Sequence, residues 1–116
     1  MTKLPPLPSQ IKIGTQVFKV VSRSNKDDGM LNDGNFGYTL DSASLIVVDA
    51  SISPSKQRVT FVHEMLHAIN MTLGGGTKPN KDAEFEEWEH HFIGIYEESL
   101  LMVLRDNPEV AAYLVA

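Results

Sequence analysis

The segment from Ser53 to Gly76 constrains the fold of this chain more than any other part of it. Ser53 is a favourable N-cap, and Pro54 suits the first position of a helix, where no backbone hydrogen bond is lost. Three glycines at 74–76 should end that helix. Apolar residues recur at helical spacing between these signals: Val59, Val62, Leu66, Ile69 and Leu73. We therefore expect one amphipathic helix whose apolar stripe packs against a core.

The same helix carries the sequence His63-Glu64-Met65-Leu66-His67, an HExxH box. Two imidazoles four residues apart project from one helical face, so both can bind the same metal ion. Glu64 points beside that metal, where it can accept a proton from a metal-activated water. We expect the histidines to share a stripe with Thr60 and Asn70, at the border between core and solvent. Two histidines flanking a glutamate at this spacing predict a metal centre rather than ordinary surface histidines.

Composition limits the other classes of function. A chain of 116 residues with 42% hydrophobic content predicts one globular domain over residues 11–116, preceded by a flexible, proline-rich arm over residues 1–10. Without cysteine, any metal must be held by His, Asp or Glu, a ligand set that suits Zn²⁺. The net charge of −5 gives no support to nucleic-acid binding. No apolar run reaches membrane-spanning length and the arm lacks a signal-peptide core, so we expect a cytoplasmic protein.

The N-terminal half reads as strands. Residues 11–13 and 17–21 alternate around Gly14 and predict a strand or a hairpin. The polar stretch 22–35 reads as a loop, in which the acidic residues act as turn formers rather than calcium ligands. Residues 36–40 and 44–49 predict two strands joined by a tight turn at Asp41-Ser42. The continuously apolar run 45–48 favours a strand that is buried on both faces or lies centrally in the sheet.

The C-terminal half reads as helices. Asn80 or Asp82 can cap a long helix that runs to about Arg105, and Pro108 to Val115 should form a short last helix. Strands followed by helices predict an α+β domain. We expect a short antiparallel or mixed sheet that covers one side of the HExxH helix, followed by the long second helix.

A catalytic zinc site usually has three protein ligands, and the long second helix offers candidates for the third. Its expected inward stripe is Phe85, Trp88/Glu89, Phe92/Ile93, Tyr96, Leu100 and Val103/Leu104. His90 lies at the edge of that stripe, Glu89 lies within it, and Glu86 is on the same side as His90, one turn earlier. His91 falls on the far side, where we expect it to be solvated. Helical geometry ranks His90 first, then Glu89, then Glu86.

The chain resembles small phage- and prophage-encoded members of the ImmA/IrrE-type zincin metallopeptidases. The likeness covers roughly residues 11 to 115 and is carried by two segments: His63-Glu64-Met65-Leu66-His67-Ala68-Ile69 and Leu100-Leu101-Met102-Val103-Leu104-Arg105-Asp106-Asn107-Pro108-Glu109. The resemblance implies a minimal zincin-like fold and a glutamate ligand on the later helix. Counted back from the tail, that glutamate falls on His90, which departs from the family pattern but keeps a metal-binding side chain.

These observations predict a zinc-dependent metallopeptidase that acts on a protein or peptide substrate. His63, His67 and His90 would hold Zn²⁺, and Glu64 would act as general base. An edge strand from residues 36–49 would align the substrate, and Tyr38, Tyr96 or Tyr113 would stabilise the oxyanion. The resemblance implies a regulatory protein, such as a transcriptional repressor, as substrate. The alternative is a non-enzymatic, phage-encoded interaction protein that retains a zincin-like metal site. The sequence does not predict an oligomeric state.

Overall fold

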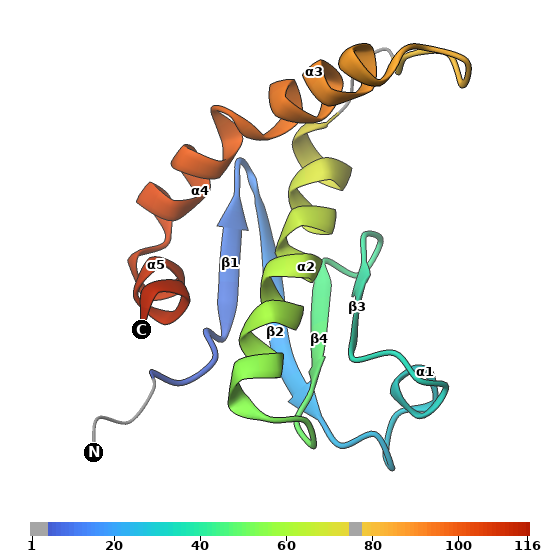
Figure 1. The fold of residues 1–116 in the computed structure, drawn as a ribbon. Coiled ribbons are helices and arrows are strands. Elements are labelled where there is room, and N and C mark those ends of the chain that lie inside the picture. The colour runs from blue at the N-terminus through green and yellow to red at the C-terminus, as the bar shows by residue number, and fades with distance from the viewer. Residues whose placement is uncertain (1–4, 75–77) are drawn as a thin grey trace.

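The computed structural model describes residues 5–74 and 78–116. It shows an α+β chain with a mixed sheet on which helix α2 (Pro54–Leu73) lies (Figure 1). In the described ranges the sheet has four strands in the order β1-β2-β4-β3. The predicted α+β fold class is therefore confirmed. Residues 1–4 of the expected arm lie outside the described residues, whereas Leu7 packs against the core.

The sheet is built from two hairpins joined by a parallel pair. Strands β1 (Gln10–Ile13) and β2 (Gln16–Arg23) pair antiparallel around Gly14, whose φ of 60° suits glycine at this tight turn. Strands β3 (Gly37–Leu40) and β4 (Leu45–Asp49) also pair antiparallel. β4 runs parallel to β2 and lies between β2 and β3. The predicted strands and the central position of the apolar run 45–48 are confirmed.

The segment expected to be only a loop contains a short helix, α1 (Gly29–Asn32). Asp28 caps it by accepting hydrogen bonds from the backbone N–H groups of Met30 and Leu31, at 3.0 and 3.3 Å. The other carboxylate oxygen of Asp28 accepts hydrogen bonds from the Tyr38 hydroxyl at 2.6 Å and from Arg23 at 3.3 Å. Asp28, expected only to form a turn, therefore also links α1 to Arg23 of β2 and Tyr38 of β3.

Helix α2 begins as predicted, with Ser53 accepting a hydrogen bond from the backbone N–H of Lys56. It ends at Leu73 with Gly74 at the C-cap, while Gly75 and Gly76 lie outside the described residues. The predicted inward stripe is confirmed at Ile69, which is fully buried, and is half-buried at Val62 and Leu66. It is wrong at its two ends, since Val59 is 70% exposed and Leu73 is 39% exposed. The residues that α2 buries are Thr60, Phe61, Glu64, Met65, Ala68 and Ile69.

The buried face of α2 packs against the C-terminal helices as well as against the sheet. The Phe61 ring meets the Tyr113 ring edge-on, with 5.7 Å between their centroids. Ala68 lets the helix approach the core closely, because its side chain is a single methyl group. The core combines sheet residues with residues of α2 and the C-terminal helices: Ile11, Ile13, Phe18, Val20, Ile46, Val48, Phe61, Met65, Ala68, Ile69, Val103, Val110 and Tyr113.

The long second helix predicted to start at Asn80 or Asp82 is instead two shorter helices. Helix α3 spans Phe85–Tyr96 and α4 spans Ser99–Asp106, with a turn at Glu97-Glu98 between them. The Ser99 hydroxyl donates a hydrogen bond to the Ile95 carbonyl at 2.5 Å, a type of contact that often bends helices. The last helix, α5 (Pro108–Val115), is as predicted.

The predicted inward stripe holds only for the later part of this region. Val103 is buried, and Tyr96, Leu100 and Leu104 pack against the core. By contrast, α3 buries none of its residues, and Phe85 is 77% exposed. Figure 1 shows that α3 extends past the end of the sheet, and Tyr96 at its C-terminal end is the residue of α3 that packs against the core. Within the described ranges, no helix is both long and apolar enough to cross a membrane.

Candidate metal centre

The two histidines of the HExxH box converge on one point. His63 Nε2 and His67 Nε2 lie 3.1 Å apart, one helical turn from each other on α2. Two nitrogens bound to one zinc ion at about 2.0–2.1 Å in a tetrahedral arrangement are roughly 3.3 Å apart. The pair therefore fits a shared metal ion. We expect these histidines at the border between core and solvent, but the structure exposes both. The reason is that α2 turns its Thr60-Glu64 face inward.

Glu64 is the buried member of the box. The residue is only 5% exposed, and its Oε2 lies 4.0 Å from His63 Nε2. Its Oε1 accepts a hydrogen bond from the Thr39 hydroxyl at 2.9 Å (Thr39 Oγ1 also lies 3.2 Å from the Glu64 carbonyl oxygen). A carboxylate that is buried, oriented by a donor and close to the His63 imidazole has the placement that a general base needs.

Strand β3 can lie this close to α2 because residue 37 is a glycine. A Cβ atom at Gly37 would lie 2.7 Å from both Thr60 Cγ2 and the Val47 carbonyl oxygen, and 3.3 Å from Glu64 Cγ. The first two distances are too short for carbon-carbon or carbon-oxygen contacts. A side chain at position 37 would therefore push β3 away from the helix and disturb Glu64.

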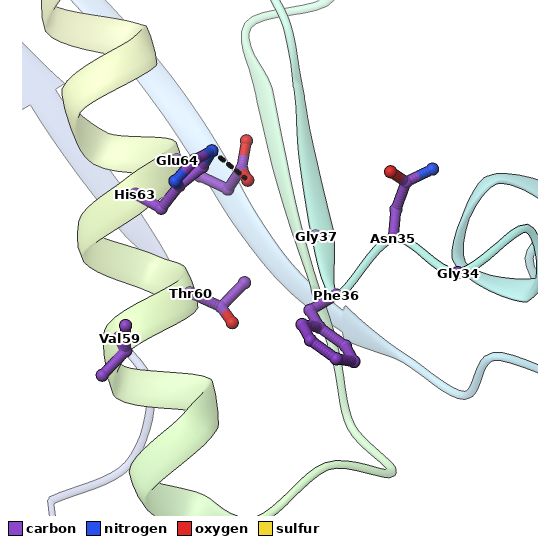
Figure 2. Close-up of a pocket in the computed structure, with 8 residues that line it drawn as sticks. All are labelled: Gly34, Asn35, Phe36, Gly37, Val59, Thr60, His63 and Glu64. Carbon is purple, nitrogen blue, oxygen red and sulfur yellow. Dashed lines mark ion pairs between the residues drawn. The ribbon is translucent and has the colours of Figure 1, made fainter.

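A pocket of about 300 Å³ opens beside the box, between α2 and the segment that leads into β3. Figure 2 shows Thr60 and Glu64 pointing from α2 toward Gly37, with the Phe36 ring turned toward the helix. The lining residues are Gly34, Asn35, Phe36, Gly37, Val59, Thr60, His63 and Glu64. The Lys56 ammonium lies 4.5 Å from the centre of the Phe36 ring, so it places a positive charge near the pocket.

The pocket borders an edge of the sheet with free backbone groups. Phe36 and Asp49 form a hydrogen-bonded pair, because the Asp49 N–H donates to the Phe36 carbonyl at 2.8 Å. In an antiparallel ladder such pairs recur at every second residue, so Tyr38 belongs to the next one. The N–H and C=O groups of Gly37 and Thr39 consequently point away from β4. In the part of the chain that the structure describes, no strand pairs with this outer edge of β3. An extended peptide could pair there by adding a strand.

The opposite edge of the sheet is closed by a side chain. The Asn107 amide nitrogen donates to the Lys12 carbonyl at 2.7 Å, and the Asn107 amide oxygen accepts from the Lys12 N–H at 2.8 Å. This side chain thus imitates a neighbouring strand on β1. Asn107 is 2% exposed and also donates to the Val103 carbonyl at 2.7 Å. The contrast leaves β3 as the better edge for a peptide.

The three tyrosines proposed as oxyanion donors lie in different places. Tyr38 is held by Asp28, and the hydrogen bond to that carboxylate adds to the burial that raises the pKa of its hydroxyl. Tyr113 packs in the core against Phe61. The Tyr96 hydroxyl donates to the Leu66 carbonyl at 3.4 Å, within the HExxH segment, and burial raises its pKa. Of the three, Tyr96 alone has its hydroxyl hydrogen-bonded to α2 in the described residues.

The candidates for the third ligand are on exposed α3. His90 Nε2 lies 3.7 Å from Glu86 Oε1, and both side chains are more than two-thirds exposed. Glu89 is also exposed. His91, expected to be solvated, is instead half-buried beside the rings of Trp88 and Phe92. Among the described residues, no third His, Asp or Glu forms a group of three potential metal ligands with the box histidines. The order His90, Glu89, Glu86 stays a prediction.

Sequence reasoning missed two residues at this site, Thr39 and Gly37. Strand alternation places them on the same face of β3. The turn expected at Asp41-Ser42 is instead four residues long, 41–44, and this length sets Thr39 opposite Ile46. What the sequence lacked was a signal for which turn of α2 packs over that face.

No family model, curated protein or solved structure matches the chain.

Proposed function

We propose that this chain is a zinc-dependent metallopeptidase with a minimal zincin-like fold. The observation that carries the proposal is the geometry of the HExxH box: two imidazole nitrogens 3.1 Å apart, beside a buried carboxylate hydrogen-bonded to Thr39. The resemblance to ImmA/IrrE-type zincins in the two quoted segments supports the same assignment. Zinc in such a site supplies Lewis acidity, which lowers the pKa of water and polarises a carbonyl group.

The chain's own residues supply the remaining steps. His63 and His67 would hold the metal, with His90 on α3 as the leading candidate for a third ligand. Glu64 would take a proton from the attacking water and pass it to the leaving amine. The free edge of β3 would bind the substrate in an extended conformation, next to the Glu64 carboxylate. By resemblance, the substrate would be a regulatory protein such as a transcriptional repressor.

The alternative is a non-enzymatic interaction protein that retains a metal site. One observation favours it: helix α3 exposes large apolar side chains, with Phe85 77%, Phe92 51% and Ile93 50% exposed. Exposed apolar residues grouped on one helix often mark a protein-binding surface. The buried, oriented Glu64 favours the peptidase, because a purely structural metal site has no use for a general base.

The substitution Glu64→Gln separates these two functions. It keeps the shape of the side chain and its contact with Thr39 but removes the base. We expect the parent and the variant to bind about one equivalent of zinc with similar affinity, measured by mass spectrometry and zinc titration. Peptide hydrolysis should fall by at least about a hundredfold in the variant. Equal hydrolysis by parent and variant, or no hydrolysis by zinc-loaded parent protein on a broad peptide mixture, would contradict the peptidase proposal.

A further inference from the structure

The pocket beside the box has a size and lining that bear on substrate choice. Its volume of about 300 Å³ is at the small end of ligand pockets, so it suits a single side chain rather than a large ligand. Both Glu64 and Gly37 line it, and Gly37 is the first residue of the free edge of β3. A peptide paired with that edge would direct one of its side chains toward α2 at this point, because alternate side chains point to opposite faces of a strand.

The charges around the pocket give no preference for an ionised side chain of either sign, because they are opposite and offset each other. Glu64 supplies a buried carboxylate on one wall, and the Lys56 ammonium lies over the Phe36 ring. An ionised side chain would also lose its hydration on entering the pocket. The apolar surface comes from Phe36, which is 48% exposed, and from Val59, which is 70% exposed. Covering these two side chains would remove apolar area from water and favour binding.

We infer that this pocket selects an uncharged, apolar side chain of the substrate, next to the peptide bond that is cleaved, and that Phe36 determines the preference. The inference rests on the proposed peptidase function for its role, but the pocket's binding preference can be measured without hydrolysis. The substrate class is thus a polypeptide that presents an extended segment with a leucine- or phenylalanine-like side chain.

The test uses short peptides on chelator-treated parent protein, so that no cleavage occurs. Acetylated and amidated alanine pentapeptides carry Leu, Phe, Lys or Asp at the centre, and binding is followed by the amide NMR shifts of Gly37, Thr60 and His63. The Leu and Phe peptides should bind at least about tenfold more tightly than the Lys and Asp peptides, as expected for burial of one apolar side chain. Equal affinities, or no binding of any peptide at these amides, would overturn the inference.

A matched pair of variants assigns the preference to Phe36. Phe36→Asp should abolish it, whereas Phe92→Asp should leave it unchanged, since Phe92 is similarly exposed, at 51%, but lies on α3 away from the pocket. Val59→Asp replaces Phe36→Asp if circular dichroism shows that the latter does not fold. Equal effects of the pocket variant and Phe92→Asp would refute the role of the pocket.

Hydrolysis is measured separately, with zinc-loaded parent protein and the same peptides extended at both ends. Apolar-selective binding together with cleavage beside the apolar residue supports both the pocket preference and the peptidase. Apolar-selective binding without cleavage supports the pocket and contradicts the peptidase. Cleavage that ignores the central residue contradicts the pocket and supports the peptidase. The two ideas therefore fail in different experiments.

Discussion

The Thr39 hydroxyl donates a hydrogen bond to Glu64 Oε1 at 2.9 Å, which joins the edge strand of the sheet to the proposed general base. Thr39 lies on β3, opposite Ile46 of β4, and Glu64 lies in the middle of α2. The strand that would bind a substrate thus also orients the group that would act on it. Thr39 is a positioning residue, because it acts through Glu64.

The variant Thr39→Val tests this role. Valine keeps the shape and removes the hydroxyl, so Glu64 loses its oriented donor while zinc binding remains. We expect kcat for peptide hydrolysis to fall by about tenfold to a hundredfold with little change in KM, which is the usual range for such supporting contacts. Thr39→Ser restores a hydroxyl and should recover most of the activity. A Thr39→Val protein with parental kcat would show that the hydrogen bond does not matter for catalysis.

Asn107 gives a prediction about stability. Its amide makes two hydrogen bonds with the backbone of Lys12 and one with the carbonyl of Val103. Asn107→Ala leaves these backbone groups without partners, so we expect the free energy of unfolding to fall by about 2–3 kcal/mol in urea titrations. The matched control is Asn32→Ala at an exposed position of α1, which should cost less than about 1 kcal/mol. Equal losses in the two variants would contradict this role of Asn107.

Asp28 gives a prediction about pH. The hydrogen bond from the Tyr38 hydroxyl, together with those from the α1 backbone and Arg23, lowers the pKa of Asp28 below its ordinary value of 3.8. A lowered pKa in the folded state means that the carboxylate stabilises the fold at higher pH and that this contribution is lost as the pH falls through the folded pKa. Asp28→Asn should therefore destabilise the protein more at about pH 7 than at about pH 3.

Urea unfolding of the parent and Asp28→Asn at both pH values measures this difference. The control is Asp33→Asn, which changes an exposed carboxylate at the other end of α1. The control should have little effect on stability at either pH. If the gap between parent and Asp28→Asn has the same size at both pH values, the ionised carboxylate of Asp28 does not stabilise the fold.

The local elements were predictable because their signals are local. The N-cap at Ser53, the turn at Gly14 and the apolar run 45–48 each depend on neighbouring residues alone, and the structure confirms them. The HExxH geometry follows in the same way, since helical spacing by itself brings His63 and His67 together. No tertiary information is needed for these features.

The tertiary features were not predictable because they depend on which surfaces meet. Val59 matches the apolar period of α2 but is 70% exposed, since the packing of Phe61 against Tyr113 sets the rotation of the helix. Phe85 matches the period of α3 but is 77% exposed, because α3 extends past the end of the sheet. The contact between Thr39 and Glu64 joins residues 25 positions apart, and no local pattern encodes it.

The proposed zinc site needs a third ligand besides His63 and His67. His90 lies on α3 beside Glu86, on a helix that buries none of its residues and so has few contacts to hold it in place. Zinc bound by His63 and His67 would gain a third protein ligand if α3 supplied His90. We therefore expect His90→Ala to weaken zinc binding by at least about tenfold.

Competition titration with a zinc-binding dye measures this loss, and three variants serve for comparison. His63→Ala should abolish zinc binding, because it removes half of the converging pair. His91→Ala should change zinc affinity little, since that ring packs beside Trp88 and points about 100° further round the helix. Glu89→Gln tests the rival ligand. If Glu89→Gln weakens zinc tenfold while His90→Ala does not, the third ligand is Glu89 and the HExxH pair keeps its role.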